Sequence, residues 1–549
     1  MRISAFLLAA GWFCLTGVLT AGQTPAVARG ASSDHPSESC ELLATLQLPH
    51  VGIAMAKPVA AGAFVAPPQL YTAADLAEFF KKLPAFCRIV AHDRPTPDSD
   101  IVIEIWMPLE GWNGKLQGIG NGGFAGQIDY QELGAAVGKG YAAVATDTGH
   151  DGSPIDAAWA LGHPEKVIDF GYRAIHEMTG LAKLVVQRFY ATPPSHSYFA
   201  SCSDGGREAL MEAQRFPADY DGILAGAPAN YWTAQLTVGA VDTQALTATP
   251  ASFIPPAKIP TIARAVLAAC DHLDGLSDGI LNDPRQCHFD PASIECKHGK
   301  DSAACLTSAQ VTALKKIYAG LRDAQGRQVF PGYLPGAEEG GNGWETWITG
   351  PAPDKSLLTF FSEGYFSDIV YGKADWNLKT FNWESGLQAA DEETASALNA
   401  VNPDLSAFRA RGGKLILYHG WDDPAIPALN TVNYYEGVEA KMGLAETDSF
   451  TRLYMVPGMQ HCGEGPGPDN FGESWTWTAS DPQHNVRIAL EDWVETGAAP
   501  AAIIATKTAG SDGQGPAVMT RPLCPYPQAA KYKGSGDLNR AENFVCAAQ

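Results

Sequence analysis

The stretch that decides the predicted fold is Tyr198-Phe199-Ala200-Ser201-Cys202-Ser203-Asp204-Gly205-Gly206-Arg207-Glu208-Ala209-Leu210. Its apolar start predicts a strand, and the helical pattern after it, with the apolar residues Leu210 and Met211 against the polar residues Glu208, Glu212 and Gln214, predicts a helix. A serine held in a tight turn between a strand and a helix is typical of a nucleophile elbow, which raises the hydroxyl above the sheet. Ser201 stands where the G-x-S-x-G pattern has its first glycine, and it is small enough for that position. The pattern predicts Ser203 as a nucleophile, although an ordinary strand-to-helix turn can look the same.

A second stretch far downstream, Met455-Val456-Pro457-Gly458-Met459-Gln460-His461-Cys462-Gly463, strengthens this interpretation. His461 directly precedes a cysteine, as Ser203 directly follows one. If Cys202 and Cys462 form a disulfide, their Cα atoms lie only about 4.4–6.8 Å apart. Such a bond would place the Ser203 hydroxyl beside the His461 ring.

Composition limits the classes of protein that the chain can belong to. It has 549 residues, of which 46% are hydrophobic and 18% are charged, as expected for a globular protein with a large core. The formal net charge of -22 argues against nucleic acid or an anionic membrane surface as a partner. No stretch beyond the N-terminal segment is long and apolar enough to predict a membrane span.

The N-terminal segment predicts export. Arg2 precedes an apolar run from Ile3 to Leu19, and small residues at Ala26 and Ala28 fit a cleavage site, so residues 1–28 are predicted as a signal peptide of a secreted or periplasmic protein. Without Cys14, ten of the eleven cysteines remain, an even number typical of a disulfide framework. Local spacing suggests three pairs, Cys270 with Cys287, Cys296 with Cys305, and Cys524 with Cys546. Cys40 would then pair with Cys87, and Cys202 with Cys462 as the remaining pair, although the sequence leaves other connectivities open. A zinc site is the alternative, but no Cys-x-x-Cys pair is present.

The order of elements along the chain predicts an α/β fold. Strands are expected at 101–108, from 115, at 141–147, 221–229, 414–423 and 451–456, with a helix over 171–190. This alternation is typical of a parallel, doubly wound sheet. The rhythm stops near Trp232, so we expect a catalytic domain in two parts, 29–231 and 405–549, with residues 232–404 inserted as a lid domain.

A glycine-rich loop, Gly118-Ile119-Gly120-Asn121-Gly122-Gly123-Phe124-Ala125-Gly126, follows the second of these strands. It is interpreted as an oxyanion loop that offers a backbone N–H to the reacting carbonyl. A phosphate-binding loop is an alternative, but the glycine spacing fits neither a Walker A motif nor a dinucleotide-binding fingerprint. A plain flexible loop is the remaining alternative.

An acid is expected between serine and histidine in chain order, after a strand. Asp422 and Asp423 both have this position, and one of them is expected to be a solvated loop aspartate. His419, His150 and His163 are interpreted as structural, because none accompanies a second catalytic feature.

Three carboxylates, Asp271, Asp274 and Asp278, gather within eight positions of the predicted lid. They repel one another unless solvent or a hard cation such as Ca²⁺ neutralises them. An exposed acidic turn and a calcium site are both consistent with this pattern, which is not an EF-hand.

The paired Cys-Ser and His-Cys motifs and the acid after His-Gly-x-x-Asp resemble the tannase/feruloyl esterase family of α/β-hydrolases, bacterial members and mono(2-hydroxyethyl) terephthalate hydrolases included. The likeness covers most of the chain, including Arg521-Pro522-Leu523-Cys524-Pro525-Tyr526-Pro527. The resemblance implies a Ser203, His461, Asp423 triad, a disulfide beside it, and oxyanion donors at the N–H groups of Gly123 and Asp204. It also implies a lid calcium ion held by the side chains of Asp271, Asp274 and Asp278 and the carbonyls of Leu276 and Ile280, with no organic cofactor.

The expected substrate is a small aromatic ester. The lid holds Trp344, Trp347, Phe360, Phe361, Tyr365 and Phe366, which suit a phenolic acyl group or, alternatively, form lid core. The predicted substrate contacts are Trp347, Phe361 and Ile426. Leu357, with Lys355 nearby, stands where terephthalate-monoester hydrolases of the family have a carboxylate-binding arginine. A feruloyl or galloyl ester is therefore favoured, with a terephthalate monoester, an inactive binding protein and a serine peptidase as alternatives.

Overall fold

A nine-stranded sheet organises the computed structural model of the chain, which describes residues 40–69, 76–473, 479–510 and 515–548. The predicted signal peptide at 1–28 lies outside the described residues. In spatial order the strands are β1 (Val51–Val59), β2 (Phe86–Asp93), β3 (Ile101–Pro108), β5 (Ala142–Thr146), β4 (Lys115–Ile119), β6 (His196–Cys202), β7 (Gly222–Gly226), β10 (Lys414–Gly420) and β11 (Thr451–Val456).

The sheet is mixed, which corrects the prediction of a parallel sheet. From β5 to β11 neighbouring strands run parallel, while β1, β2, β3 and β5 pair antiparallel. The connection from β2 to β3 is too short to hold the crossover helix that a parallel pair requires. The carboxyl ends of β4, β6, β7, β10 and β11 lie at one edge, where open α/β sheets place their ligands.

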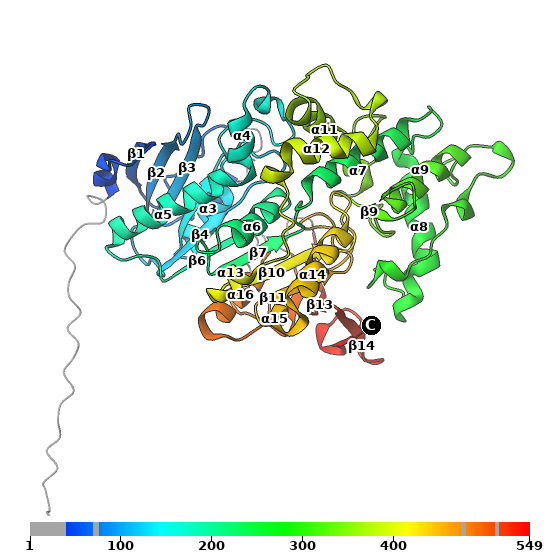
Figure 1. Ribbon diagram of the computed structural model, residues 1–549. Coiled ribbons are helices and arrows are strands. Elements are labelled where there is room, and N and C mark those ends of the chain that lie inside the picture. The colour runs from blue at the N-terminus through cyan, green and yellow to red at the C-terminus, as the bar shows by residue number, and fades with distance from the viewer. Residues whose placement is uncertain (1–39, 70–75, 474–478, 511–514, 549) are drawn as a thin grey trace, which may run out of the picture. The chain divides into compact units, whose positions relative to one another are not determined.

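Helices cover both faces of this sheet (Figure 1). On one face α5, α6 and α14 bury Met178, Leu210 and Val432, and on the other α3 and α16 bury Leu133 and Trp493. The bounds are α2 (Leu76–Phe80), α3 (Tyr130–Gly138), α4 (Pro164–Ile168), α5 (Ala174–Tyr190), α6 (Asp204–Arg215), α7 (Trp232–Thr247), α8 (Ile259–Cys270), α9 (Ser308–Ala319), α10 (Trp344–Trp347), α11 (Leu357–Gly364), α12 (Trp383–Leu398), α13 (Ser406–Ala410), α14 (Ala428–Met442), α15 (Leu444–Asp448) and α16 (Val486–Thr496). No helix among the described residues is long and apolar enough to cross a membrane.

Local sequence sets several helix ends. Asn485 caps α16 by accepting the N–H groups of Arg487 and Ile488, and Gly497 ends that helix in the left-handed conformation. Thr307 and Gln310 form a capping box at the start of α9. The helix expected over 171–190 is α5, and a π-helical turn at Asp169–Arg173 precedes it.

The segment between β7 and β10 builds a hydrophobic cluster of its own. Its buried members run from Ala234 to Leu387 and include Trp344 and Leu358. Figure 1 shows α7, α11 and α12 of this segment next to one another. A second cluster joins the segment to the glycine-rich loop 118–126, since Phe124 packs against Trp232 and Phe361 with ring centroids 5.9 and 5.3 Å apart. The exact lid bounds, 232–404, remain a prediction.

Short hairpins complete the described chain: β8 (Leu321–Arg322) with β9 (Gln328–Phe330), β12 (Ile503–Thr508) with β13 (Ala517–Leu523), and β14 (Gln528–Tyr532) with β15 (Phe544–Ala548). Within the described residues, five disulfides join Cys40–Cys87, Cys202–Cys462, Cys270–Cys287, Cys296–Cys305 and Cys524–Cys546, which confirms the predicted pairs. Every cysteine of the described residues is therefore bonded, which leaves no thiolate for the alternative zinc site.

Candidate active site

Ser203 lies in the sharp turn between β6 and α6. Its backbone has φ 68° and ψ -123°, a region that non-glycine residues rarely adopt and that a nucleophile elbow requires. A Cβ on Gly205 would lie 1.9 Å from the Ser201 hydroxyl, and one on Gly206 would lie 2.3 Å from the Gly226 carbonyl oxygen. The two glycines thus let α6 start close beside β7, and Ser201 fits the small position that precedes the turn.

The disulfide between Cys202 and Cys462 connects this turn to the loop after β11. The two Cα atoms are 6.0 Å apart, across a sequence separation of 260 residues. The ring nitrogen Nε2 of His461 lies 2.9 Å from Ser203 Oγ, within hydrogen-bond distance. The structure therefore brings together the two side chains that flank these cysteines in sequence.

Asp423, after β10, completes the arrangement. Its Oδ2 lies 2.8 Å from His461 Nδ1, while its Oδ1 accepts the N–H groups of Ala425 at 2.8 Å and Ile426 at 2.9 Å. Burial opposes ionisation of this carboxyl, but the charge and hydrogen bonds of His461 and His419 outweigh burial and hold the pKa of Asp423 well below its usual range. Asp423 is thus a carboxylate that orients the His461 ring.

Asp422 differs in its contacts. Both aspartates are 2% exposed, which corrects the expectation that one of them is solvated. Burial, and after it the nearby Glu338 carboxyl, raise the pKa of Asp422 well above its usual range. The Oδ1 atom of Asp422 has no hydrogen-bond partner among the described residues. Segments far away in sequence bury Asp422, so the residues next to it in sequence could not indicate its burial.

The predicted oxyanion donors have no acceptor within the described part of the chain. Asp204 is the first residue of α6, where backbone N–H groups lack intrahelical partners, and Gly123 adopts φ +60° in the glycine-rich loop. A Cβ on Gly123 would meet the Pro154 carbonyl oxygen at 2.3 Å, so the loop needs glycine here. The Asn121 N–H donates to Glu208 Oε2 at 2.9 Å and ties the loop to α6.

A cavity of about 600 Å³ opens at these groups. Its lining includes Ser203, His461 and Gly123 from the sheet edge, and Trp347, Leu357 and Phe361 from the segment between β7 and β10. Trp347 and Phe361 are stacked, with ring centroids 6.2 Å apart and an interplanar angle of 11°. Ile426 is not part of this lining; it is 4% exposed, and its backbone contacts Asp423.

The remaining histidines lie in different surroundings. His150 is buried, stacked on Trp159 and within 2.7 Å of the Phe124 carbonyl oxygen, and His163 is an exposed partner of Asp98. His419 instead lies 3.1 Å from Asp423 Oδ2, which corrects the prediction that no second feature of the site accompanies this histidine. Its position four residues before Asp423 at the end of a buried strand was the available signal.

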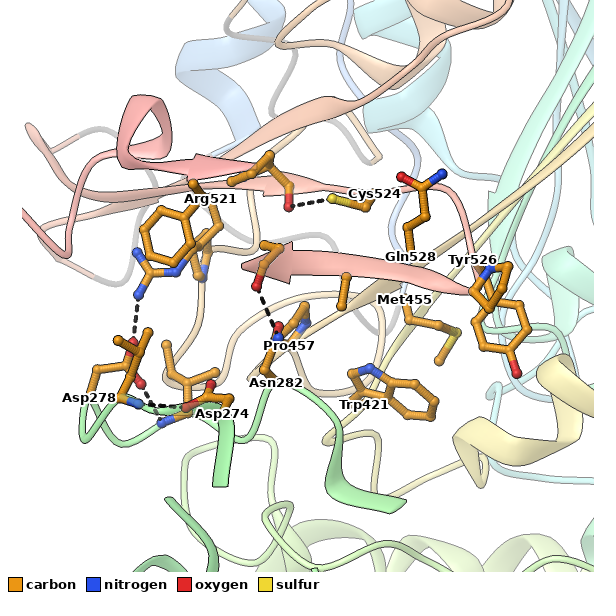
Figure 2. A pocket seen from close by; sticks show the side chains of 18 of the residues that line it. Asp274, Asp278, Asn282, Trp421, Met455, Pro457, Arg521, Cys524, Tyr526 and Gln528 are labelled. Atoms are coloured by element: carbon orange, nitrogen blue, oxygen red, sulfur yellow. Dashed lines mark hydrogen bonds and ion pairs between the residues drawn. The ribbon is translucent and has the colours of Figure 1, made fainter. Parts of the chain in front are cut away.

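The acidic loop, Asp271–Ile280, contacts the C-terminal hairpins. Asp278 Oδ2 accepts a hydrogen bond from Arg521 Nη2 at 2.5 Å, and Asn282, two residues after the loop, donates from Nδ2 to the Ala530 carbonyl oxygen at 3.1 Å. Figure 2 shows both contacts across the pocket between the loop and β13 and β14. Burial, followed by the charges of Asp278 and Asp271, raises the pKa of Asp274.

The donors of this loop match calcium in kind, because Ca²⁺ prefers carboxylate and carbonyl oxygens. Because the charges of Asp278 and Asp271 contribute to the raised pKa of Asp274, the three carboxylates are close enough to repel one another. Within the described residues, however, no three His, Cys, Asp or Glu side chains converge as metal ligands, and Asp278 uses one oxygen on Arg521.

Comparisons with known proteins agree with the fold and with the family resemblance of the sequence. A profile of the family described as tannase and feruloyl esterase matches residues 87–547. An uncharacterized esterase of Xanthomonas campestris pv. campestris is 40% identical over 537 residues, covering 93% of this chain and 91% of that protein. A mono(2-hydroxyethyl) terephthalate hydrolase of Piscinibacter sakaiensis is 36% identical over 82% of each chain.

Among solved structures, feruloyl esterase B from Aspergillus oryzae matches with a TM-score of 0.84 and 29% identity, covering 93% of this chain and 100% of that chain. The match spans both the sheet and the segment inserted between β7 and β10. The chain belongs to the tannase and feruloyl esterase family and is a carboxylic ester hydrolase with the α/β-hydrolase fold.

Proposed function

We propose that the chain is an exported serine esterase that hydrolyses esters of phenolic acids, of the feruloyl or galloyl type, through an acyl-enzyme on Ser203. The observation that carries the proposal is the continuous line of hydrogen-bonding atoms from Ser203 Oγ through His461 to Asp423 Oδ2, with separations of 2.9 and 2.8 Å. A serine next to an oriented imidazole is the arrangement that nucleophilic acyl transfer requires.

The first step forms the acyl-enzyme. Because the Asp423 carboxylate only accepts hydrogen bonds, His461 Nδ1 carries the hydrogen and Nε2 offers its lone pair to Ser203. Nε2 takes the hydroxyl proton as Oγ attacks the ester carbonyl, and Asp423 stabilises the resulting imidazolium. The N–H groups of Gly123 and Asp204 stabilise the oxyanion, and His461 then gives its proton to the leaving alcohol.

The second step releases the acid. Water enters in place of the alcohol, and His461 removes a proton from it as it attacks the acyl carbonyl. The tetrahedral intermediate collapses, Ser203 Oγ leaves with the proton from His461, and the free aromatic acid departs. The same two N–H donors serve both steps, because each passes through an oxyanion at the same place.

The walls of the cavity support an aromatic acyl group. Trp347 and Phe361 present ring surface beside Ser203 and His461, and Leu357 lies with them in the lining. Phenolic rings gain from such stacking and from the burial of apolar area. Lys355, which is close to Leu357 in sequence, is exposed, and its ammonium group lies over the Phe360 ring.

Activity on a terephthalate monoester is the second candidate. A relative with 36% identity bears the name of such a hydrolase, and Arg487 lies in the cavity lining, where a substrate carboxylate could pair with it. Against this, Glu132 Oε2 lies 3.3 Å from Arg487 Nη2, and the guanidinium also donates to the carbonyls of Gly472 and Glu473. These existing contacts favour the neutral phenolic ester.

Two further parts of the proposal concern export and calcium. Five disulfides are typical of proteins that mature in an oxidising compartment, which supports a secreted or periplasmic location. A structural Ca²⁺ ion would be held by the side chains of Asp271, Asp274 and Asp278 and the carbonyls of Leu276 and Ile280, and it would offset their mutual repulsion.

A substrate panel tests the proposed function. Purified protein is assayed on methyl ferulate, methyl gallate, mono(2-hydroxyethyl) terephthalate and a matched anilide, alongside Ser203→Ala and the exposed control Ser195→Ala. We expect turnover of a phenolic methyl ester, loss of turnover in Ser203→Ala only, and unchanged circular dichroism in both variants. Substantial hydrolysis by Ser203→Ala would remove the nucleophile assignment, and preference for the terephthalate ester would select the second candidate.

A further inference from the structure

The side chain of Asp423 lies against two histidines. His419 is the sixth residue of β10, is 0% exposed, and places Nε2 3.1 Å from Asp423 Oδ2. The same oxygen lies 2.8 Å from His461 Nδ1. One carboxylate oxygen thus joins the proposed general base to a second imidazole that does not contact Ser203.

The protons of this group follow from the chemistry of its members. A carboxylate can only accept, so the ring nitrogens that face it, His461 Nδ1 and His419 Nε2, both carry hydrogen. His419 Nδ1 lies 2.7 Å from the hydroxyl of buried Thr431, which donates to Nδ1 when the ring is neutral. His419 Nε2 also lies 3.1 Å from the Ile426 carbonyl oxygen, which shares its hydrogen.

The carboxylate then has a donor group beside each of its four acceptor positions. Two backbone N–H groups, those of Ala425 and Ile426, hold Oδ1, and the two imidazoles hold Oδ2. Without His419, Oδ2 would keep a single partner in a buried site, and the plane of the carboxylate would be fixed from one side only. A buried charge that loses a donor is costly and tends to reorient.

We propose that His419, held by Thr431, is a positioning residue that fixes the Asp423 carboxylate in the orientation that His461 needs as general base. The inference rests on the proposed function, because it assigns His419 a part in the same serine chemistry. His419 acts through Asp423 and touches no reacting atom, so its removal changes the rate of the chemical step and leaves substrate binding nearly intact.

Substitutions at two positions separate this role from packing. His419→Leu keeps apolar volume but removes both ring nitrogens, whereas His419→Gln offers an amide N–H near the position of Nε2. Thr431→Val removes the hydroxyl that holds the ring. Thr447→Val is the matched control, because it removes an equally buried hydroxyl of α15 that donates to the carbonyl of Gly443, the residue before that helix, away from the site.

Each purified variant is compared with the wild type by kcat and KM on the best ester of the panel. The rate at which a fluorophosphonate labels Ser203, and the melting temperature, are measured on the same samples. For His419→Leu we expect kcat and the labelling rate to fall about 10- to 100-fold with KM nearly unchanged, as for the loss of one hydrogen bond to a charged group. His419→Gln should recover much of the loss, Thr431→Val should show a smaller loss of the same kind, and Thr447→Val should retain wild-type rates.

Wild-type kcat and labelling in folded Thr431→Val together with His419→Leu would overturn the proposal, as would an increase in KM with unchanged kcat. If His419→Leu fails to fold, Thr431→Val against Thr447→Val decides alone: equal rates in these two overturn the proposal. Failure of the wild type to hydrolyse any ester or to react with the fluorophosphonate is a different result, because it removes the proposed function itself.

Discussion

The indole of Trp347 lies edge-on to the imidazole of His461, with ring centroids 4.9 Å apart and an interplanar angle of 73°. Trp347 Nε1 donates to Asn342 Oδ1 at 2.7 Å, and Asn342 Nδ2 donates to the His461 carbonyl oxygen at 2.9 Å. The segment between β7 and β10 therefore both covers the proposed base and contributes the aromatic wall beside it.

This contact predicts that Trp347 sets the affinity for aromatic esters. Replacing it by leucine removes ring stacking worth about 1 kcal/mol beyond area burial, so KM for a phenolic ester should rise roughly 5- to 10-fold. Trp347→Phe should retain most of the affinity. Steady-state kinetics with methyl ferulate and an aliphatic ester of similar size measure the effect; an equal change for both esters would show that the ring recognises no aromatic group.

The two adjacent aspartates should differ sharply in their effect on rate. Asp423→Asn removes the acceptor that fixes the His461 tautomer, and kcat should fall by on the order of 10⁴. Asp422 has a pKa raised well above its usual range, so Asp422→Asn replaces a neutral acid by a neutral amide of the same shape and should change kcat little. A larger loss in Asp422→Asn than in Asp423→Asn, measured on folded protein, would reverse the assignment.

The Cys202–Cys462 disulfide should be needed for activity more than for folding. It lies in the cavity lining, where a reductant reaches it, and it holds Ser203 and His461 together across 260 residues. We expect mild reduction, or the double change to alanine, to lower kcat before near-ultraviolet circular dichroism is lost. The double change at Cys296 and Cys305, which span 9 residues in the segment between β7 and β10, should spare kcat. Loss of both signals in one transition would make the bond merely structural.

The buried carboxyl of Glu208 predicts how stability depends on pH. Burial, and after it the charge of Asp204, raise the pKa of Glu208 to about 8. The folded chain keeps this proton, whereas the unfolded chain loses it above the ordinary glutamate pKa of about 4.3. The contribution of Glu208 to the free energy of unfolding is therefore fully present below that pH and is lost as pH rises toward 8. For one proton, the free energy of unfolding falls by at most about 1.4 kcal/mol per pH unit.

Urea unfolding at several pH values between 5 and 8 measures this slope. Glu208→Gln, which cannot titrate, should reduce the fall in the free energy of unfolding over this range, while the exposed control Glu110→Gln should leave it unchanged. Identical slopes for the wild type and Glu208→Gln would show that Glu208 does not retain its proton in the folded chain.

The sequence predicted the parts of the site that short local motifs encode. The elbow around Ser203 and the Cys-Ser and His-Cys neighbours are short motifs, and one disulfide converts their local patterns into spatial proximity. Three features have no local motif: the antiparallel pairing of β1, β2, β3 and β5, the burial of Asp422, and the pairing of Asp278 with Arg521 across 243 residues. Each depends on partners that only tertiary packing supplies, so neither periodicity nor spacing could indicate them.

The acidic loop predicts that calcium stabilises the chain. An ion bound only by the folded chain adds stability with concentration, about 2.7 kcal/mol at 100 times its dissociation constant. The melting temperature should therefore rise with Ca²⁺ and fall with a chelator, and Asp274→Asn should abolish the difference. Asp290→Asn is the matched control, since it removes an exposed aspartate that pairs with Lys315 elsewhere in the same segment and should keep the response. Because Asp278 already pairs with Arg521, a melting temperature indifferent to Ca²⁺ in the wild type would mean that this ion pair, and no metal, balances the loop.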